Sequence, residues 1–227
     1  MIFSIRKIIT VLWAVWLVLT LFHFTFGLDF QPSSWSEPSA GERLTERFLL
    51  TAEGNIPTLF STVLFLAAAG LLYAVSQSSV AFRKHWKGLS WIFFFLAIDE
   101  TGCFHEILSI QMRLAVETHG ILYYPWTGPA VLLVAVLTGI YLRFFLALEW
   151  RIQIFFLIAA FLFLGGTLGL EFYQGMLIDQ GTERSIQQAF LLASIEEAVE
   201  LAGQIVFIHG LLDLLKRTHP QGEIRIV

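Results

Sequence analysis

Long apolar runs, separated by short polar segments, make up most of this chain. Six of these runs have about the 20 residues that an α-helix needs to cross a bilayer. They predict transmembrane helices at residues 8–27, 56–77, 89–110, 127–148, 152–172 and 187–214. The pattern therefore predicts an all-α, polytopic membrane bundle that forms a single domain over residues 1–227, without an internal repeat.

The composition supports this class and excludes others. Of the 227 residues, 56% are hydrophobic and only 14% are charged, which leaves too little polar surface to cover a soluble domain. The expected partner is thus the lipid bilayer. We expect no nucleic-acid partner, because the chain has no basic run suited to one. The single cysteine, Cys103, excludes an internal disulfide framework.

The distribution of lysine and arginine predicts the orientation. Six spans put ten basic residues on the side of the termini: Arg6, Lys7, Arg83, Lys84, Lys87, Arg143, Arg151, Lys216, Arg217 and Arg225. The opposite side holds four: Arg43, Arg47, Arg113 and Arg184. This bias predicts both termini in the cytoplasm and a location in a bacterial inner (plasma) membrane.

The first apolar run has a second interpretation. Arg6 and Lys7 precede it, as basic residues precede the apolar core of a signal peptide. The run is long and no A-x-A site follows it, so we expect a retained membrane helix, with cleavage as the alternative.

Residues 28–55 form the longest predicted external segment. Ser39 and Glu42 have the spacing of a capping box, and apolar residues follow at helical spacing. We expect a short interfacial helix there. Asn55 and Pro57 are typical of a helix start and predict the beginning of the second span.

Acidic residues interrupt the predicted spans, with no lysine or arginine beside them. They are Asp99, Glu100, Glu106, Glu171, Glu196, Glu197 and Glu200. Each costs about 2.5–3.5 kcal/mol at mid-bilayer, so seven charged, lipid-facing acids would cost roughly 17–25 kcal/mol. A fold stable by about 5–15 kcal/mol does not withstand that cost. The acids must therefore face inward, where they are protonated, bound to metal or lining a wet cavity.

Helical geometry groups the acids on polar faces. At about 100° per residue, Asp99, His105 and Glu106 share an arc of about 120° on the third span, with Glu100 to one side. The last span carries one polar stripe, made of Glu196, Glu197, Glu200 and Gln204. We expect these two spans to pack directly together, because both stripes need the same shelter.

The axial rise of a helix sorts the same residues by depth. Asp99 and the acids of the last span fall in a deep layer. His105, Glu106, Glu171 and His23 fall nearer the outer face. Since helix ends predicted from sequence shift by a few residues, the two layers can also form one site.

Carboxylates with one or two imidazoles suit iron, manganese or zinc better than copper(I). Bundles that hold two irons use several glutamates and histidines that point inward, although the usual Glu-x-x-His pair is absent here. The expected metal ligands are Asp99, His105, Glu106, Glu171, Glu196, Glu197 and Glu200, with His23, Glu100, Cys103 and Gln204 as further candidates. No catalytic residue is assigned.

Small and aromatic residues surround the acids. Gly165 and Gly169 have G-x-x-x-G spacing beside Glu171, and Gly203 follows the acids of the last span. Such spacing predicts close helix contact. The aromatic Trp126 is predicted as an interfacial anchor.

The strings AIDETGCFHE and IEEAVELAGQIVFIHGLL resemble an uncharacterised group of small bacterial polytopic membrane proteins. That group carries a Leu-Asp-Glu-x-x-x-x-His-Glu motif and a carboxy-terminal Glu-Glu-x-x-Glu-x-x-Gly helix. The corresponding residues are Asp99, Glu100, His105, Glu106, Glu196, Glu197, Glu200 and Gly203, with Ile98 in place of the usual leucine. The resemblance covers two of the six spans. It implies that the two motifs form one site and implies no activity.

Two functions of different class follow from these features. The first is a metal-binding oxidoreductase, of di-iron type, that acts on a lipid-soluble or quinone-like substrate. The alternative is a proton- or cation-coupled transporter or channel, which at this size would be expected to form a homodimer. A role as accessory subunit of a larger membrane complex is the third.

Overall fold

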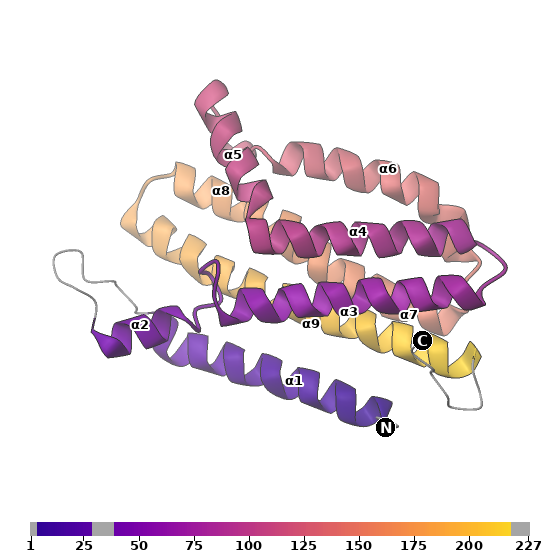
Figure 1. Cartoon of the computed structure of the whole chain (residues 1–227). Coiled ribbons are helices and arrows are strands. Elements are labelled where there is room, and N and C mark those ends of the chain that lie inside the picture. The colour runs from indigo at the N-terminus through magenta and orange to yellow at the C-terminus, as the bar shows by residue number, and fades with distance from the viewer. Residues whose placement is uncertain (1–3, 29–38, 219–227) are drawn as a thin grey trace.

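The computed structural model describes residues 4–28 and 39–218, and this part of the chain folds into helices and turns without a strand (Figure 1). The elements are α1 (Ile5–Phe22), η1 (His23–Gly27), α2 (Ala40–Glu46), α3 (Ile56–Ser78), α4 (Arg83–Gly102), α5 (Phe104–Ala115), η2 (Gly120–Leu122), α6 (Thr127–Leu146), α7 (Trp150–Leu164), η3 (Gly165–Leu170), α8 (Glu171–Asp179) and α9 (Glu183–Thr218). The predicted all-α bundle is confirmed.

Within the described residues, five helical segments are long and apolar enough to cross a membrane. They are Ile5–Gly27, Ile56–Ser78, Thr127–Leu146, Trp150–Asp179 and Glu183–Thr218. Each overlaps one of the spans expected from the sequence. The sixth expected span corresponds to α4, which has basic residues at its start and acids near its end and is not among the five.

The core lies between α3, α7 and α9, where α3 and α7 each pack against α9. Their fully buried side chains include Leu72, Ile152, Ile205 and Leu211. On the other side of α9, α1 is attached through Trp16, whose Nε1 donates to the carbonyl of Ala198 at 2.7 Å. The long α9 is therefore the helix on which the bundle is assembled.

The predicted capping box precedes α2. Ser39 Oγ accepts from the Glu42 backbone N–H at 3.2 Å, and a Glu42 carboxylate oxygen accepts from the Ser39 N–H at 2.7 Å. Asn55 caps α3 by accepting from the Thr58 N–H, with Pro57 in the first turn. These two helix starts were predicted correctly. Residues 29–38 of the segment 28–55 lie outside the described residues.

The expectation of one continuous helix over 89–110 was wrong. The helix breaks at Cys103, whose φ of 51° lies in the left-handed region. Its continuation, α5, leaves the line of α4 and projects from the end of the bundle (Figure 1). The face calculated for an unbroken helix therefore does not apply beyond Gly102.

The third span packs on the last less extensively than the sequence predicted. In the bundle α4 packs along α3, and α3 packs along α9. One stacked aromatic pair links α4 to α9 directly: the rings of Phe93 and Phe207 lie 4.5 Å apart at 5°. The space between α4 and α9 is occupied by a cavity instead.

α6 is held mainly near its two ends. At one end Trp126 bonds to Glu171, at the start of α8. Near the other end Phe144 packs edge-on against Trp86 of α4, with centroids 4.6 Å apart, and Tyr141 fits closely over Gly88. Only 6% of the 18-residue apolar stretch of α6 is buried. This leaves space between the middle of α6 and the rest of the bundle.

The expected G-x-x-x-G contact was assigned to the wrong glycines. A Cβ added to Gly165 or Gly169 meets nothing within 4 Å. The close approach uses Gly166, where a Cβ would lie 3.0 Å from Glu200 Cγ, and Gly203, where it would lie 3.0 Å from the Ala159 carbonyl oxygen. These two glycines bring α7 and η3 against the acidic part of α9.

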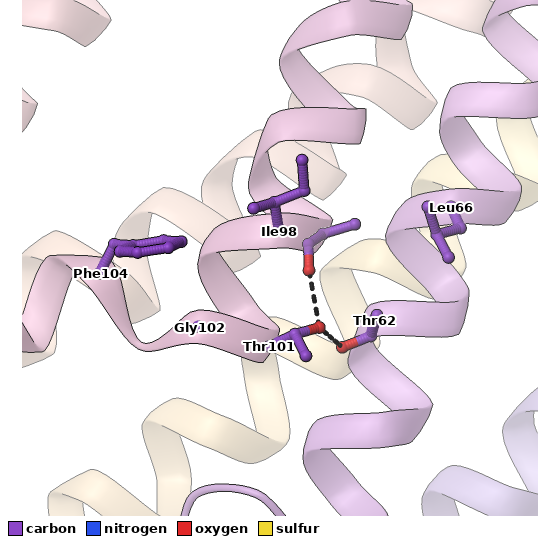
Figure 2. A pocket seen from close by; sticks show the side chains of 7 residues that line it. Thr62, Leu66, Ile98, Thr101, Gly102 and Phe104 are labelled. Atoms are coloured by element: carbon purple, nitrogen blue, oxygen red, sulfur yellow. Dashed lines mark hydrogen bonds between the residues drawn. The ribbon is translucent and has the colours of Figure 1, made fainter.

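A small pocket of about 390 Å³ lies where α3, α4 and the start of α5 meet (Figure 2). The hydroxyls of Thr62 and Thr101 lie 3.1 Å apart at one edge, and the Thr101 hydroxyl donates to the Ala97 carbonyl. Figure 2 also shows Phe104 beyond the break at Gly102 and Cys103. The lining is mostly apolar, so this pocket carries no chemistry of its own.

Candidate functional site: an acidic cavity inside the bundle

A cavity of about 990 Å³ lies among α3, α4, α5, α6, α7, α8 and α9. All seven acids that the sequence singled out line it, together with His105 and Gln204. The structure adds an eighth carboxylate, Glu53, from the turn before α3. The motifs of the third and sixth predicted spans therefore do face one space.

Asp99 is bound to the first turn of α5. One carboxylate oxygen accepts from the His105 backbone N–H at 3.1 Å, and the other lies 2.8 Å from His105 Nδ1. Asp99 thus caps the helix that follows the break and fixes the imidazole ring. This makes it a positioning residue for α5.

The His105 ring leads to the next carboxylate. Its centroid lies 5.1 Å from that of Trp126, and Trp126 Nε1 donates to Glu171 at 2.8 Å. The sequence predicted Trp126 as an interfacial anchor and did not predict this hydrogen bond to an acid of the site.

Two acids of α9 accept bonds from neutral side chains across the cavity wall. The Thr167 hydroxyl donates to Glu200 at 2.7 Å, and the Gln174 amide donates to Glu196. Both donors belong to the segment η3–α8, as does Glu171. This segment therefore supplies the neutral hydrogen-bond donors for α9.

Glu197 differs from its neighbours, because it makes no hydrogen bond within the described residues. It interacts electrostatically with Glu200 and with Glu100 of α4. Glu100 also interacts with Glu200, so Glu100, and not Asp99, is the α4 carboxylate that faces the acids of α9. Helical geometry placed Glu100 to one side of the site, and this was wrong: the Asp99 carboxylate is bound to His105, which leaves Glu100 toward the acids of α9.

Gln204 continues the same stripe one turn below Glu200. Its Nε2 donates to Ser61 Oγ at 2.8 Å, and Ser61 lies within hydrogen-bonding reach of Glu100. The Oε1 of Gln204 is buried and has no partner among the described residues, although the residue is only 5% exposed. Such an atom is costly to leave unpaired.

Glu53 and Glu106 lie near the end of the cavity where α4 and α5 meet. Cys103 Sγ donates to Glu53 at 3.5 Å. Burial raises the pKa of the Glu53 carboxyl, and the nearby Glu106 raises it further. Cys103 therefore sits at the break beside the site and does not line the cavity.

The rest of the cavity is apolar. Beyond Gln204 its walls are formed by aliphatic and aromatic side chains of α4, α6, α7 and α9, among them Val134, Leu137, Tyr141, Phe145, Phe156 and Phe207. From Trp126 to Tyr141 the cavity follows α6 for roughly 22 Å, at 1.5 Å per residue. It has an acidic half and an apolar half.

His23 lies outside this cavity. It is fully buried at the end of α1, where Nδ1 accepts from the Leu50 N–H at 3.1 Å and Nε2 lies 2.8 Å from Ser194 Oγ. Both ring nitrogens are occupied by protein groups. This position does not suit a metal ligand.

The predicted metal would need several of these side chains around one point. Within the described residues no group of three or more histidine, cysteine, aspartate or glutamate side chains is placed to hold an ion. Asp99, Glu171, Glu196 and Glu200 each accept a bond from a different protein group. The donor types suit a hard cation, so the metal stays a prediction.

Several lining residues escaped the sequence analysis. Thr167 and Gln174 were missed, although with the predicted Glu171 they lie at i, i+4 and i+7 within an apolar run, a spacing that indicates one polar helix face. The signal for this face is the uncharged polar residues, and not only the acids, at helical spacing. Ser61 and Tyr124 have no comparable sequence signal, since their role depends on tertiary contacts.

A family model described as a domain of unknown function (DUF8692) matches residues 9–215. The chain belongs to this family. The match runs from α1 to the last turns of α9 and includes every residue that lines the cavity. No curated protein and no solved structure matches the chain.

Proposed function

We propose that this is an integral membrane protein that binds a lipid-soluble molecule in the cavity of its bundle. One observation carries the proposal: a single cavity joins an acidic half to an apolar half. Its volume of about 990 Å³ is at the upper end of the range for small-molecule sites, roughly 300–1,000 Å³. An amphiphile matches both halves, with its polar group at the carboxylates and its chain along α6.

The lower part of α9 supports a binding site more than a conduction path. Below Gln204 its side chains Ile205, Ile208, Leu211 and Leu215 are all buried among apolar neighbours. Beyond Gln204 the cavity lining contributed by α9 is Phe207, so a proton or ion that reaches Gln204 meets no further polar side chain of this helix on the cavity wall. Transport in this conformation is therefore less well supported.

The proposal includes six spans, with α4 as the third, and both termini in the cytoplasm of a bacterial inner membrane. α4 has 20 residues, roughly 30 Å of helix, and runs beside α3. The ten-to-four bias of basic residues supports the orientation.

α5 supports burial of the acidic half within the membrane. Its polar side chains His105, Ser109 and Arg113 line the cavity. Phe104 and Leu108, on the opposite face, are 53% and 47% exposed. An exposed apolar face is favourable against lipid, so α5 would cover the site in the outer leaflet.

A metal-dependent oxidoreductase with the same lipid-soluble substrate is the second candidate. The oxygen-rich lining favours it, and the separation of the carboxylates counts against it. Elemental analysis of protein purified without chelators decides between them: roughly one or two equivalents of iron, manganese or zinc would support the second candidate.

Native mass spectrometry tests the first. Detergent-purified protein is freed of lipid and mixed with hexadecanol as the probe. We expect one bound hexadecanol in the parent. Val134→Phe, which fills the apolar half, should reduce this occupancy several-fold. Val136→Phe, two residues away on the exposed side of α6, is the matched control and should bind as the parent does. Equal binding by the two variants would refute the site.

A further inference from the structure

The polar atoms left open in the cavity indicate which kind of head group it accepts. The donors of Trp126, Thr167 and Gln174 already serve Glu171, Glu200 and Glu196. Acceptors of the lining without a hydrogen bond in the described residues include the carboxylates of Glu106 and Glu197, Ser109 Oγ and Oε1 of Gln204. Gln204 provides the independent sign of a missing ligand, because an oxygen of a residue only 5% exposed lacks a partner.

Two of these acceptors, the carboxylate of Glu197 and Oε1 of Gln204, share one face of α9. Positions 197 and 204 are separated by seven residues, which is about two turns, and Glu200 lies between them. Glu100 of α4 interacts electrostatically with Glu197 and Glu200 from the opposite wall. Seven residues correspond to about 10.5 Å along the helix, so one head group between α4 and α9 can reach Glu200 and Gln204, which are one turn apart, while Glu100 and Glu197 add negative charge around it.

Positive charge is scarce around this point. Among the described lining residues the only basic side chains are His105, which is paired with Asp99, and Arg113, which donates to the Tyr123 hydroxyl. Ser109 and Tyr124 carry hydroxyls that serve equally as donors and acceptors, so they do not select for charge. The surplus of acids favours a positively charged head group, and the unpartnered acceptors favour one that donates hydrogen bonds.

We propose that the molecule bound in the cavity is a cationic amphiphile, a long-chain amine whose ammonium group lies beside Glu200 and donates to Gln204, with Glu100 and Glu197 adding negative charge around it. The proposal rests on the proposed function and specifies its substrate class. An ammonium group brings three donors and a positive charge, which matches the open acceptors and the surplus of acids. A phosphate head would bring neither.

The test compares three probes with one chain: hexadecylamine, hexadecanol and hexadecyl phosphate. Each is added to lipid-free, detergent-purified full-length protein, and native mass spectrometry measures the bound fraction. We expect the amine to bind at least about ten-fold more tightly than the alcohol, and the phosphate more weakly than both. This ranking needs no variant, so it does not depend on whether a mutant folds.

Two variants locate the effect. Glu197→Gln should lower amine affinity toward that of the alcohol while leaving hexadecanol binding unchanged. Glu183→Gln, an exposed acid at the start of the same helix, should keep the full preference. Circular dichroism and gel filtration check that both variants fold.

The failures are distinguishable. If hexadecanol binds in a Val134-dependent way but the amine has no advantage, the head-group assignment is overturned and the lipid-binding function stands. If no probe binds at this site, both are overturned. If Mn²⁺ or Zn²⁺ binds stoichiometrically and displaces the amine, the cation of the site is a metal and the amine proposal is overturned.

Discussion

The Nε2 atom of His23 lies 2.8 Å from Oγ of Ser194, and this contact joins the end of α1 to α9. The Ser194 hydroxyl donates to the Phe190 carbonyl, and His23 Nδ1 accepts from the Leu50 N–H. Nε2 must therefore carry the proton and donate to the serine. This is a neutral structural histidine, since the tautomer is the wrong one for a base that would activate Ser194.

His23→Ala should lower the free energy of unfolding by about 2–4 kcal/mol, because it leaves the buried Leu50 N–H without an acceptor. Ser194→Ala should cost less, since the contact between His23 and Leu50 survives. Chemical or thermal unfolding in detergent measures both. A larger loss in Ser194→Ala would contradict the assigned roles.

Asp99→Ala should loosen α5 from α4, because both bonds to His105 are lost. Spin labels at Phe95 and Leu114, which are 67% and 78% exposed, report the distance between the two helices. The labels are attached to cysteines introduced at these two positions, so the native Cys103 is first replaced by glycine, which accepts the positive φ. In this background we expect a broader distribution of label-to-label distances in Asp99→Ala than in the protein with Asp99. Glu106→Gln is the control with an unchanged distribution. A distribution as narrow as the parent's in Asp99→Ala would show that Asp99 does not position α5.

Gly203→Ala should destabilise the protein by about 1–3 kcal/mol. The new Cβ would lie 3.0 Å from backbone atoms of Ala159 and Phe163 on α7, so the helices must separate. Gly165→Ala is the matched control, since nothing lies within 4 Å of the added atom, and it should change stability by less than about 0.5 kcal/mol. Equal effects of the two substitutions would refute this packing.

His119 should make stability depend on pH at the end of α8. Its Nδ1 lies 3.0 Å from Asp179, and that hydrogen bond raises the pKa of His119. A raised pKa means that the pair stabilises the fold fully below about pH 6.5, the unfolded value, and that this contribution disappears as pH rises through the folded pKa. The effect is small, because the imidazole is exposed.

Asp179→Asn tests this pair, since asparagine keeps an acceptor for the Gly120 N–H and removes the charge. NMR titration should show a lower pKa for His119 in the variant. The difference in Tm between parent and variant should be larger at about pH 5.5 than at about pH 9.5. A pKa for His119 that is the same in both proteins would exclude the pair.

Sequence predicted the features that depend on local chemistry. The apolar runs located the long helices, and the caps at Ser39 and Asn55 were found because their partners lie three residues away. The inward placement of the acids followed from the cost of exposing them to lipid. Each of these features depends only on residues close together in the sequence and on the surrounding lipid or water.

The features that were missed depend on competition between local and tertiary bonds. The apolar pattern continues through Cys103, so it predicts no break. The break forms where the Asp99 side chain takes the His105 N–H that an unbroken helix would use. In the same way, Trp126 has the position of an interfacial anchor, and its bond to Glu171 joins residues 45 positions apart.

The π-helical turn η3 sets the rotation of α8 relative to α7. Such a turn holds more residues than an α-helical turn, and it is found at functional sites. Deleting one residue from Gly165–Leu170 would rotate α8 by about 100° against α7. Glu171 would then leave Trp126, and Gln174 would leave Glu196, with no change in the identity of any of the four. At this point the number of residues matters as much as their chemistry, so relatives of this protein should vary here by substitution and not by insertion or deletion.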